Sequence, residues 1–198
     1  MNFSPGLSNL PCEKHMADLA EQLYEQALVI RSRIGDERAF AELLALYGPR
    51  LLLFTQRMMH SSPESIEDIT QEIWVAIFRA LPGLIDATKF RSWAYRIARD
   101  RIYREYRRRK IPTQPLDEAR REEMPDGDAD RMPVDSEELR RCLAVIAPEH
   151  REALVLRFFD DLSCDEIARV TGATIGTVRS RIHYGKSALK SIWKEHRL

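Results

Sequence analysis

The sequence predicts an all-α protein made of two small helical domains joined by an acidic, flexible linker. Apolar residues recur every three to four positions through most of the chain, which is the spacing of one helix face. Only 8 of the 198 residues are glycine, and β-branched runs are few, so that nothing favours a sheet. Residues 111–138 carry ten acidic residues against three arginines and contain four prolines. Such a segment cannot bury much apolar surface, and it divides the helical pattern in two.

The first part is predicted to contain four helices. Residues 17–34 carry apolar side chains at helical spacing. Asp36 is a favourable N-cap for a second helix, which Pro49 is expected to kink or break. A third helix is expected from Pro63 to Leu81, with Trp74 left exposed and Phe78 turned inward. The loop 84–89 then leads into a strongly basic fourth helix.

The second part ends in a helix-turn-helix pattern. Two helices come first, the second of them opening at Pro148. Ser163 and Glu166 have the three-residue spacing of a capping box, which starts a short third helix. Gly172 is expected to end that helix, and Thr174 to cap the next. Two helices joined by a short turn with glycine are the signature of this DNA-binding motif.

The basic helix, Lys89–Lys110, holds ten Lys/Arg residues and two acidic residues, a local charge of +8 in a chain of net charge zero. Basic side chains bind phosphates, and aromatic rings stack on unpaired bases. Helical spacing assigns a buried arc to Phe90, Trp93, Ala94, Ile97 and Ala98. The same spacing assigns an exposed arc to Ser92, Tyr95, Arg96, Arg99, Tyr103 and Tyr106. The alternative is a solvated basic helix with core aromatics.

The last helix of the pattern is expected to read duplex DNA. Near its start, Arg179 has the shape to contact a guanine edge, while Ser180 and His183 could contact a base or a phosphate. Lys186 is expected to bind phosphate. The segment 174–198 has six basic residues and one acidic residue. The alternative for His183 is a surface histidine without a role.

Several classes of protein are disfavoured. No apolar run approaches the roughly 20 residues of a membrane helix, and the N-terminus lacks the pattern of a secretory signal, so we expect no membrane insertion. The three cysteines, Cys12, Cys142 and Cys164, are scattered, which favours a reducing, cytoplasmic setting without disulfides. Cys12 and His15 have ligand-like spacing but lack a second pair, so no metal site and no cofactor is expected. No phosphate loop or nucleophile motif indicates an enzyme.

Four motifs together resemble a known family. They are DITQEIW at 68–74, FRSWAYRIAR at 90–99, PEHREALVLRF at 148–158, and EIA at 166–168 with GTVRSR at 176–181. In this order and separation they are similar to the extracytoplasmic-function (ECF) sigma factors of bacterial RNA polymerase, in the sigma-70 family. The resemblance covers residues 37–109 (region 2) and 138–193 (region 4). It departs at Asp100-Arg101, at Arg104 and at Tyr184-Gly185.

The resemblance implies a division into an N-terminal helical extension (1–34), region 2 (35–110), the acidic linker (111–135) and region 4 (136–198). It implies a non-catalytic, cytoplasmic specificity subunit that binds core RNA polymerase and promoter DNA and is controlled by an anti-sigma factor. The linker would follow the RNA path of the polymerase. For the extension, which is longer than in the minimal form of the family, the sequence leaves three alternatives open: it packs on region 2, it binds a regulator, or it is a frayed amphipathic tail.

The resemblance also implies three sets of site residues. Those at the clamp of the polymerase's largest subunit would be Asp68, Gln71, Glu72 and Trp74. Those at the start-proximal promoter element would be Asp86, Thr88, Lys89, Arg91, Tyr95, Arg96, Arg99 and Tyr103. Those at the upstream element would be Thr174, Thr177, Arg179, Ser180, Arg181, His183, Tyr184 and Lys186.

Two other hypotheses remain open from the sequence. A stand-alone helix-turn-helix regulator would bind duplex DNA tightly without polymerase. A nucleic-acid enzyme would need an acidic metal cluster or a nucleophile beside the basic helix. Asp68 and Glu72 lie one turn apart and could mimic such a cluster, but the apolar residues around them favour a protein interface.

Overall fold

The computed structural model describes residues 11–109 and 137–195, and every regular element in these ranges is helical. Eight α-helices follow one another: α1 Pro11–Arg33, α2 Glu37–Met58, α3 Pro63–Ala80, α4 Phe90–Arg108, α5 Glu137–Val145, α6 Pro148–Phe158, α7 Cys164–Thr171 and α8 Ile175–Glu195. Two short 3-10 turns, Leu81–Gly83 and Ala87–Lys89, join α3 to α4. The all-α prediction is confirmed, whereas the predicted linker lies outside the described residues.

Capping residues mark the starts of α2 and α3, and Asp36 is the N-cap that the sequence predicted. A carboxylate oxygen of Asp36 accepts hydrogen bonds from the backbone N–H groups of Arg38 and Ala39, at 3.0 and 3.1 Å. The hydroxyl of Ser62 accepts one from the backbone of Ser65 at the start of α3. These acceptors satisfy N–H groups that the helix itself leaves without partners.

Pro49 does not break the second helix, contrary to the expectation of a possible break. It is exposed, and α2 runs past it without interruption. The opposite side of α2 is held in the core by fully buried side chains, among them Leu43, Tyr47, Leu51 and Phe54. Packing on that side outweighs the single hydrogen bond that a proline removes on the solvent side.

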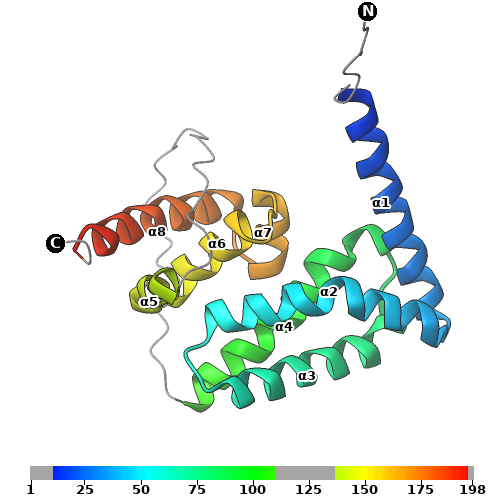
Figure 1. The fold of residues 1–198 in the computed structure, drawn as a ribbon, viewed down its shortest axis with the longest axis horizontal. Coiled ribbons are helices and arrows are strands. Elements are labelled where there is room, and N and C mark those ends of the chain that lie inside the picture. The colour runs from blue at the N-terminus through cyan, green and yellow to red at the C-terminus, as the bar shows by residue number, and fades with distance from the viewer. Residues whose placement is uncertain (1–10, 110–136, 196–198) are drawn as a thin grey trace, which may run out of the picture.

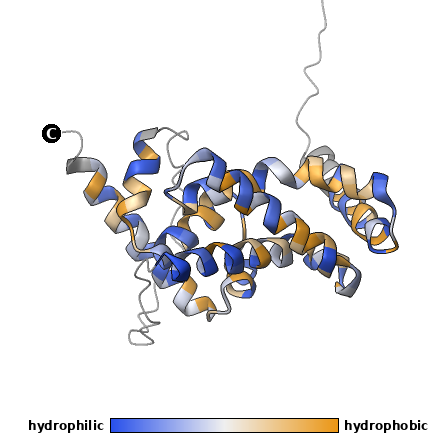
Figure 2. Cartoon of the chain, turned by 90° about the horizontal axis from the view of Figure 1, so that it is seen from below, coloured by the Kyte–Doolittle hydropathy of each residue, from blue (hydrophilic) through white to orange (hydrophobic). Residues whose placement is uncertain are grey.

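The described helices form two groups that pack against each other (Figure 1). In the first group, α2 contacts α1, α3 and α4. In the second, α8 contacts α5, α6 and α7. Contacts of α4 with α7 and of α2 with α6 join the groups, and one cluster of buried apolar residues runs through both. Most helices carry hydrophobic residues on one side and hydrophilic residues on the other (Figure 2).

Candidate nucleic-acid interface

The polar residues predicted to face the polymerase lie on the outer side of α3. Asp68, Gln71 and Glu72 are all exposed. Trp74 was expected to be exposed, but this expectation is wrong: only 9% of its surface is accessible, and its ring meets the edge of Phe40 at 6.0 Å. Phe78 was expected to be buried and is instead 61% exposed, although it also packs on Phe40. Phe40 thus contacts both rings, but only Trp74 is buried.

The loop before α4 is stabilised by one carboxylate. Asp86 accepts hydrogen bonds from the backbone N–H and the hydroxyl of Thr88, at 3.0 and 2.6 Å, and lies 3.1 Å from the ammonium group of Lys89. The Thr88 hydrogen bonds, followed by that of Lys89, lower the pKa of Asp86. The loop therefore presents Thr88 and Lys89 in a fixed orientation, with Ile85 exposed beside them.

The buried arc of α4 is as predicted for Phe90, Ala94 and Ala98, which are fully buried. The arc that was predicted to be exposed differs from the prediction. Four of its six members are buried, and they are Ser92, Tyr95, Tyr103 and Tyr106. Helix α7 packs on α4, and Glu152 of α6 and Asp160 of the turn after α6 bond to Tyr103 and Tyr95, so that the tyrosine rings face a protein surface instead of solvent. Arg96 remains exposed, and Arg91 and Arg99 are partly buried.

Two buried carboxyl groups of the second group accept from the α4 tyrosines. The hydroxyl of Tyr95 donates to Asp160 at 2.7 Å, and that of Tyr103 donates to Glu152 at 3.2 Å. The guanidinium of Arg91 donates to the backbone oxygen of Asp160. Each tyrosine thus places its ring in an apolar contact and its hydroxyl on a carboxylate, which is the usual use of a buried tyrosine.

Burial raises the pKa of both carboxyl groups. The pKa of Glu152, which is fully buried, rises to about 7, although Arg99 and Tyr103 oppose the rise. The pKa of Asp160 rises to about 6 for the same reason, against the effect of Tyr95. The Nε atom of Arg99 lies 2.9 Å from a Glu152 oxygen, but its N–H does not point at that oxygen. The ion pair therefore compensates the burial of Glu152 incompletely.

A second set of contacts joins α6 to the end of α2. The backbone oxygen of Met58 accepts from both the guanidinium of Arg151 and the hydroxyl of Tyr106. Arg151 is buried and also donates to the backbone oxygens of Ala144 and Ile146, at 2.7 and 3.0 Å. Sequence reasoning missed Arg151, Glu152 and Asp160. Charged residues in an amphipathic helix normally indicate its solvent side, and no local signal shows that a second domain covers them.

The predicted helix-turn-helix is present in α7 and α8. Ser163 and Glu166 form the capping box in both directions, and Gly172 ends α7 in the left-handed conformation at φ +72°. The hydroxyl of Thr174 accepts from the backbone of Thr177 at 3.2 Å and so caps α8. The side chain of Val178 is fully buried between the helices.

The residues predicted to face DNA on α8 are not all accessible. Thr174, Arg179, His183 and Tyr184 are exposed, and Thr177, Ser180 and Lys186 are partly buried. Arg181 is buried, contrary to expectation. Its charge opposes the rise in the pKa of Glu152 that burial causes, and adds to burial in lowering the pKa of His150. The hydroxyl of Ser180 donates to the backbone oxygen of Gly176 at 3.1 Å.

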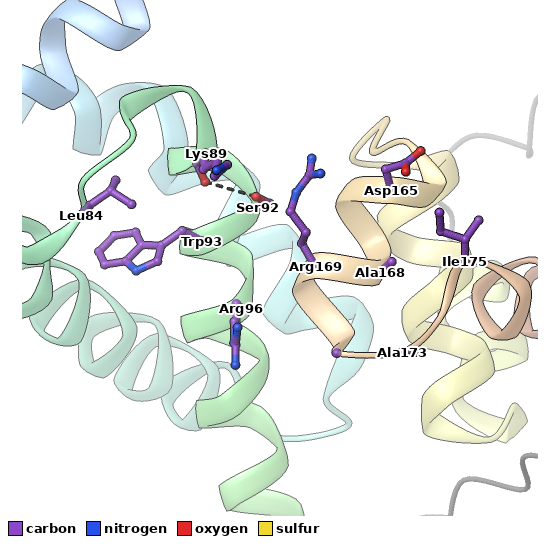
Figure 3. A pocket seen from close by; sticks show the side chains of 11 residues that line it. Leu84, Lys89, Ser92, Trp93, Arg96, Asp165, Ala168, Arg169, Ala173 and Ile175 are labelled. Carbon is purple, nitrogen blue, oxygen red and sulfur yellow. Dashed lines mark hydrogen bonds between the residues drawn. The ribbon is translucent and has the colours of Figure 1, made fainter.

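A cleft of about 620 Å³ opens between α4 and the helix-turn-helix (Figure 3). One wall has Lys89, Trp93 and Arg96, and the other has Asp165 and Arg169. The cleft thus combines several basic side chains with an indole ring. In the described parts of the chain there is no group of three His, Cys, Asp or Glu residues suited to a metal ion, and no helix long and apolar enough to span a membrane.

Comparisons with known proteins agree with these observations. The model of Sigma-70 region 2 matches residues 43–111, and that of Sigma-70, region 4 matches residues 136–189. The ECF RNA polymerase sigma-E factor of Escherichia coli K12 is 32% identical over 183 residues, which cover 86% of this chain and 95% of that protein. The RNA polymerase sigma-H factor of Pseudomonas aeruginosa is 31% identical over 181 residues, covering 85% and 93%.

Two solved structures have a similar fold. The structure of CnrH in complex with the cytosolic domain of CnrY has a TM-score of 0.67 at 21% identity and covers 87% of this chain and 98% of that chain. The sigma factor RpoE in complex with the anti-sigma factor NepR from Bartonella quintana has a TM-score of 0.63 at 23% identity, covering 78% and 96%. The sequence relationships favour a polymerase subunit over a stand-alone regulator. The chain belongs to the ECF sigma factors, the promoter-specificity subunits of bacterial RNA polymerase.

Proposed function

We propose that this sigma factor divides its work among three surfaces. Asp68, Gln71 and Glu72 on α3 bind the polymerase clamp, with exposed Phe78 beside them and Trp74 supporting them from below. The loop before α4 and the basic side of α4 bind the start-proximal promoter element. The exposed residues of α8 bind the upstream element. The chain itself carries out no catalysis and acts in the cytoplasm, where the polymerase works.

The division into residues 1–34, 35–110, 111–135 and 136–198 is part of this proposal. The observation that carries it is the separation of the two basic surfaces onto different helix groups. Lys89 and Arg96 belong to the first group, whereas Arg179 and His183 lie on the capped recognition helix of the second. Two short recognition elements on separate groups suit a protein that reads two short promoter sites together.

In the arrangement that the structure shows, part of the proposed DNA-binding surface is covered, and this arrangement is called the closed form below. Tyr95 and Tyr103, both assigned to the start-proximal element, are covered by the second helix group. Exposing them requires α4 to separate from α6 and α7. We propose that binding to core polymerase provides this separation, because two widely spaced docking sites on the polymerase would hold the groups apart.

We further propose that an anti-sigma factor stabilises the inactive form. In the two similar structures CnrH is in complex with the cytosolic domain of CnrY and RpoE with the anti-sigma factor NepR, and this chain shares their fold. The basic cleft between α4 and α7 offers an acidic partner a surface that spans both groups.

The test separates polymerase binding from promoter reading. Gln71→Ala is expected to weaken binding to core polymerase several-fold, measured by fluorescence anisotropy, because it removes an exposed polar contact on α3. Arg179→Ala is expected to bind polymerase like the parent protein but to give less run-off transcript from its own promoter. Loss of polymerase binding with Arg179→Ala would contradict the assignment of surfaces. Absence of any promoter-dependent transcript with the parent protein would overturn the function.

A further inference from the structure

One face of α1 carries an apolar stripe that nothing in the described structure covers. The stripe consists of Met16, Ala20, Leu23, Ala27 and Ile30 in α1 and of Ile34, the residue directly after the helix ends at Arg33, and is called the α1 stripe below. Its large members are strongly exposed: Met16 is 60%, Leu23 56%, Ile30 52% and Ile34 83% accessible. The opposite face of α1 is buried, with Leu28 and Val29 packed in the core against α2. The helix is therefore fixed in place while its stripe points into solvent.

The spacing of the α1 stripe is that of a coiled coil. Its members follow at intervals of 4, 3, 4, 3 and 4 residues, which is the repeat of two positions per seven residues. A helix that merely packs on a globular core has a wider apolar face and a less regular spacing. Figure 1 shows the N-terminal turns of α1 extending beyond the other helices, so that a second helix can lie along them.

The α1 stripe is complementary to itself when a second copy runs antiparallel. About an axis at Glu25, Met16 faces Ile34 of the other copy, Ala20 faces Ile30, and Leu23 faces Ala27. In the two inner layers a large side chain therefore meets an alanine, which gives even packing without a collision between two bulky groups. A parallel pair would instead place alanine on alanine and leave gaps in two layers.

Tyr24 flanks the α1 stripe close to this axis. Its ring is 54% exposed, although its hydroxyl donates to Glu42 of α2 in the same chain. The two Tyr24 rings of an antiparallel pair can therefore pack near the axis.

We propose that the α1 stripe is a self-association surface through which two copies of this chain pair as an antiparallel coiled coil. The proposal rests on α1 alone and is independent of the proposed promoter contacts. The stripe spans fewer than three full heptads, so the pairing is weak. We expect a monomer–dimer equilibrium with a dissociation constant on the order of 10 µM.

Sedimentation equilibrium of the full chain tests the pairing. Leu23→Glu places a charge at the centre of the stripe without reducing helix propensity, and it is expected to raise the dissociation constant at least tenfold. Val145→Glu, on α5, is the matched control, because Val145 is also strongly exposed but lies far from α1 (Figure 1). This control is expected to dimerise like the parent. A parent protein that stays monomeric up to roughly 100 µM, ten times the expected constant, overturns the proposal.

Disulfide trapping tests the direction. In a chain with Cys12 and Cys164 changed to serine, Gln26→Cys is expected to form a covalent dimer on mild oxidation, because position 26 flanks the stripe one residue from the axis at Glu25 and so lies only two positions out of register with its own counterpart. Met16→Cys is expected not to do so, since it faces Ile34 of the other copy. A reversed result, with Met16→Cys crosslinked and Gln26→Cys not, would refute the antiparallel pairing. Equal crosslinking at both positions would indicate random collision and would refute it as well.

Discussion

The hydroxyl of Tyr95 in α4 lies 2.7 Å from a carboxylate oxygen of Asp160, in the turn after α6, and donates a hydrogen bond to it. This bond joins a residue assigned to promoter binding to a carboxyl group of the other helix group. Asp160 is 6% exposed, and its second carboxylate oxygen has no partner in the described structure. The contact is therefore a defined polar link in the interface between the two groups.

Replacing Tyr95 by phenylalanine is expected to loosen that interface. The change keeps the ring but leaves Asp160 buried without its donor, which costs about 1 to 3 kcal/mol. Amide hydrogen exchange in α4 and α6 is expected to rise by roughly tenfold or more, since each 1.4 kcal/mol corresponds to a factor of ten. Exchange rates of the full chain, measured by mass spectrometry, report the change.

Tyr24→Phe is the control for this measurement. Tyr24 also donates to a carboxylate, that of Glu42, but its side chain is exposed and the bond lies within the first helix group. This variant is expected to leave exchange in α4 and α6 unchanged. Equal exchange in Tyr95→Phe and the parent would show that the two groups are held together by other contacts.

Raising the pH is expected to weaken the same interface through Glu152. Its pKa is about 7 in the closed structure and near 4.5 when the group is in water, so the closed form binds the proton more tightly. The stability of the closed form therefore falls as the pH rises from 5 to 8, by an amount on the order of 2 kcal/mol. Asp160 acts in the same direction at lower pH, because its pKa is raised to about 6.

Comparison with Glu152→Gln isolates this effect. The groups around Glu152 are Arg99 and Tyr103 on α4, Glu149 on its own helix, and Arg181 on α8. Burial lowers the pKa of His150, which opposes the trend near pH 6, but His150 is present in both proteins. Urea midpoints are expected to fall with pH more steeply for the parent than for Glu152→Gln. Parallel pH profiles would exclude Glu152 as the group responsible.

Local signals predicted the helices well, because the caps are encoded in neighbouring residues. Asp36, Ser62 and the Ser163–Glu166 pair each satisfy backbone groups within four positions. Periodicity alone assigned the wrong environment to Tyr95, Tyr103 and Tyr106. It identifies which residues share a face of a helix, but tyrosine suits both water and a buried hydrogen bond, and the covering helix α6 comes some 50 residues later.

The tight packing of α8 on α6 explains one departure from the family pattern. A Cβ atom at Gly185 would lie 2.9 Å from Cγ of Leu154 and 3.2 Å from the backbone oxygen of His150. Because Leu154 is fully buried, it has little room to move. Gly185→Ala is expected to destabilise the chain by about 1 to 3 kcal/mol, measured by urea unfolding.

Gly176→Ala, in the first turn of α8, is the matched control. A Cβ atom there has no neighbour closer than 3.9 Å, so alanine is expected to be neutral or to stabilise α8 by about 0.5 to 1 kcal/mol. If Gly185→Ala unfolds at the same urea concentration as the parent, Leu154 can move after all and the close approach of the two helices does not require glycine.

Arg101 connects the basic helix to the proposed polymerase surface. Its guanidinium lies 3.2 Å from a carboxylate oxygen of Glu72 on α3. This ion pair explains how a charged residue is accommodated on the otherwise apolar arc of α4. The side chain is partly buried, whereas Glu72 is mostly exposed. Arg101 therefore orients the Glu72 side chain, in addition to any contribution that its positive charge makes to binding. Arg101→Ala is expected to weaken binding to core polymerase about two- to fivefold, the range of a partly exposed ion pair worth up to 1 kcal/mol.

Arg104→Ala provides the comparison that separates position from charge. Arg104 lies on the same helix and is exposed, and its replacement by alanine removes the same formal charge. If Arg101 acted only by its charge, both variants would lower polymerase affinity equally. The geometry instead assigns the role of Arg101 to its contact with Glu72. We therefore expect Arg101→Ala to lower polymerase affinity and Arg104→Ala to leave it unchanged. In a protein that already carries Glu72→Gln, adding Arg101→Ala is expected to cause no further loss. Additive losses in that double variant, measured by the same anisotropy titration, would show that the two residues act independently.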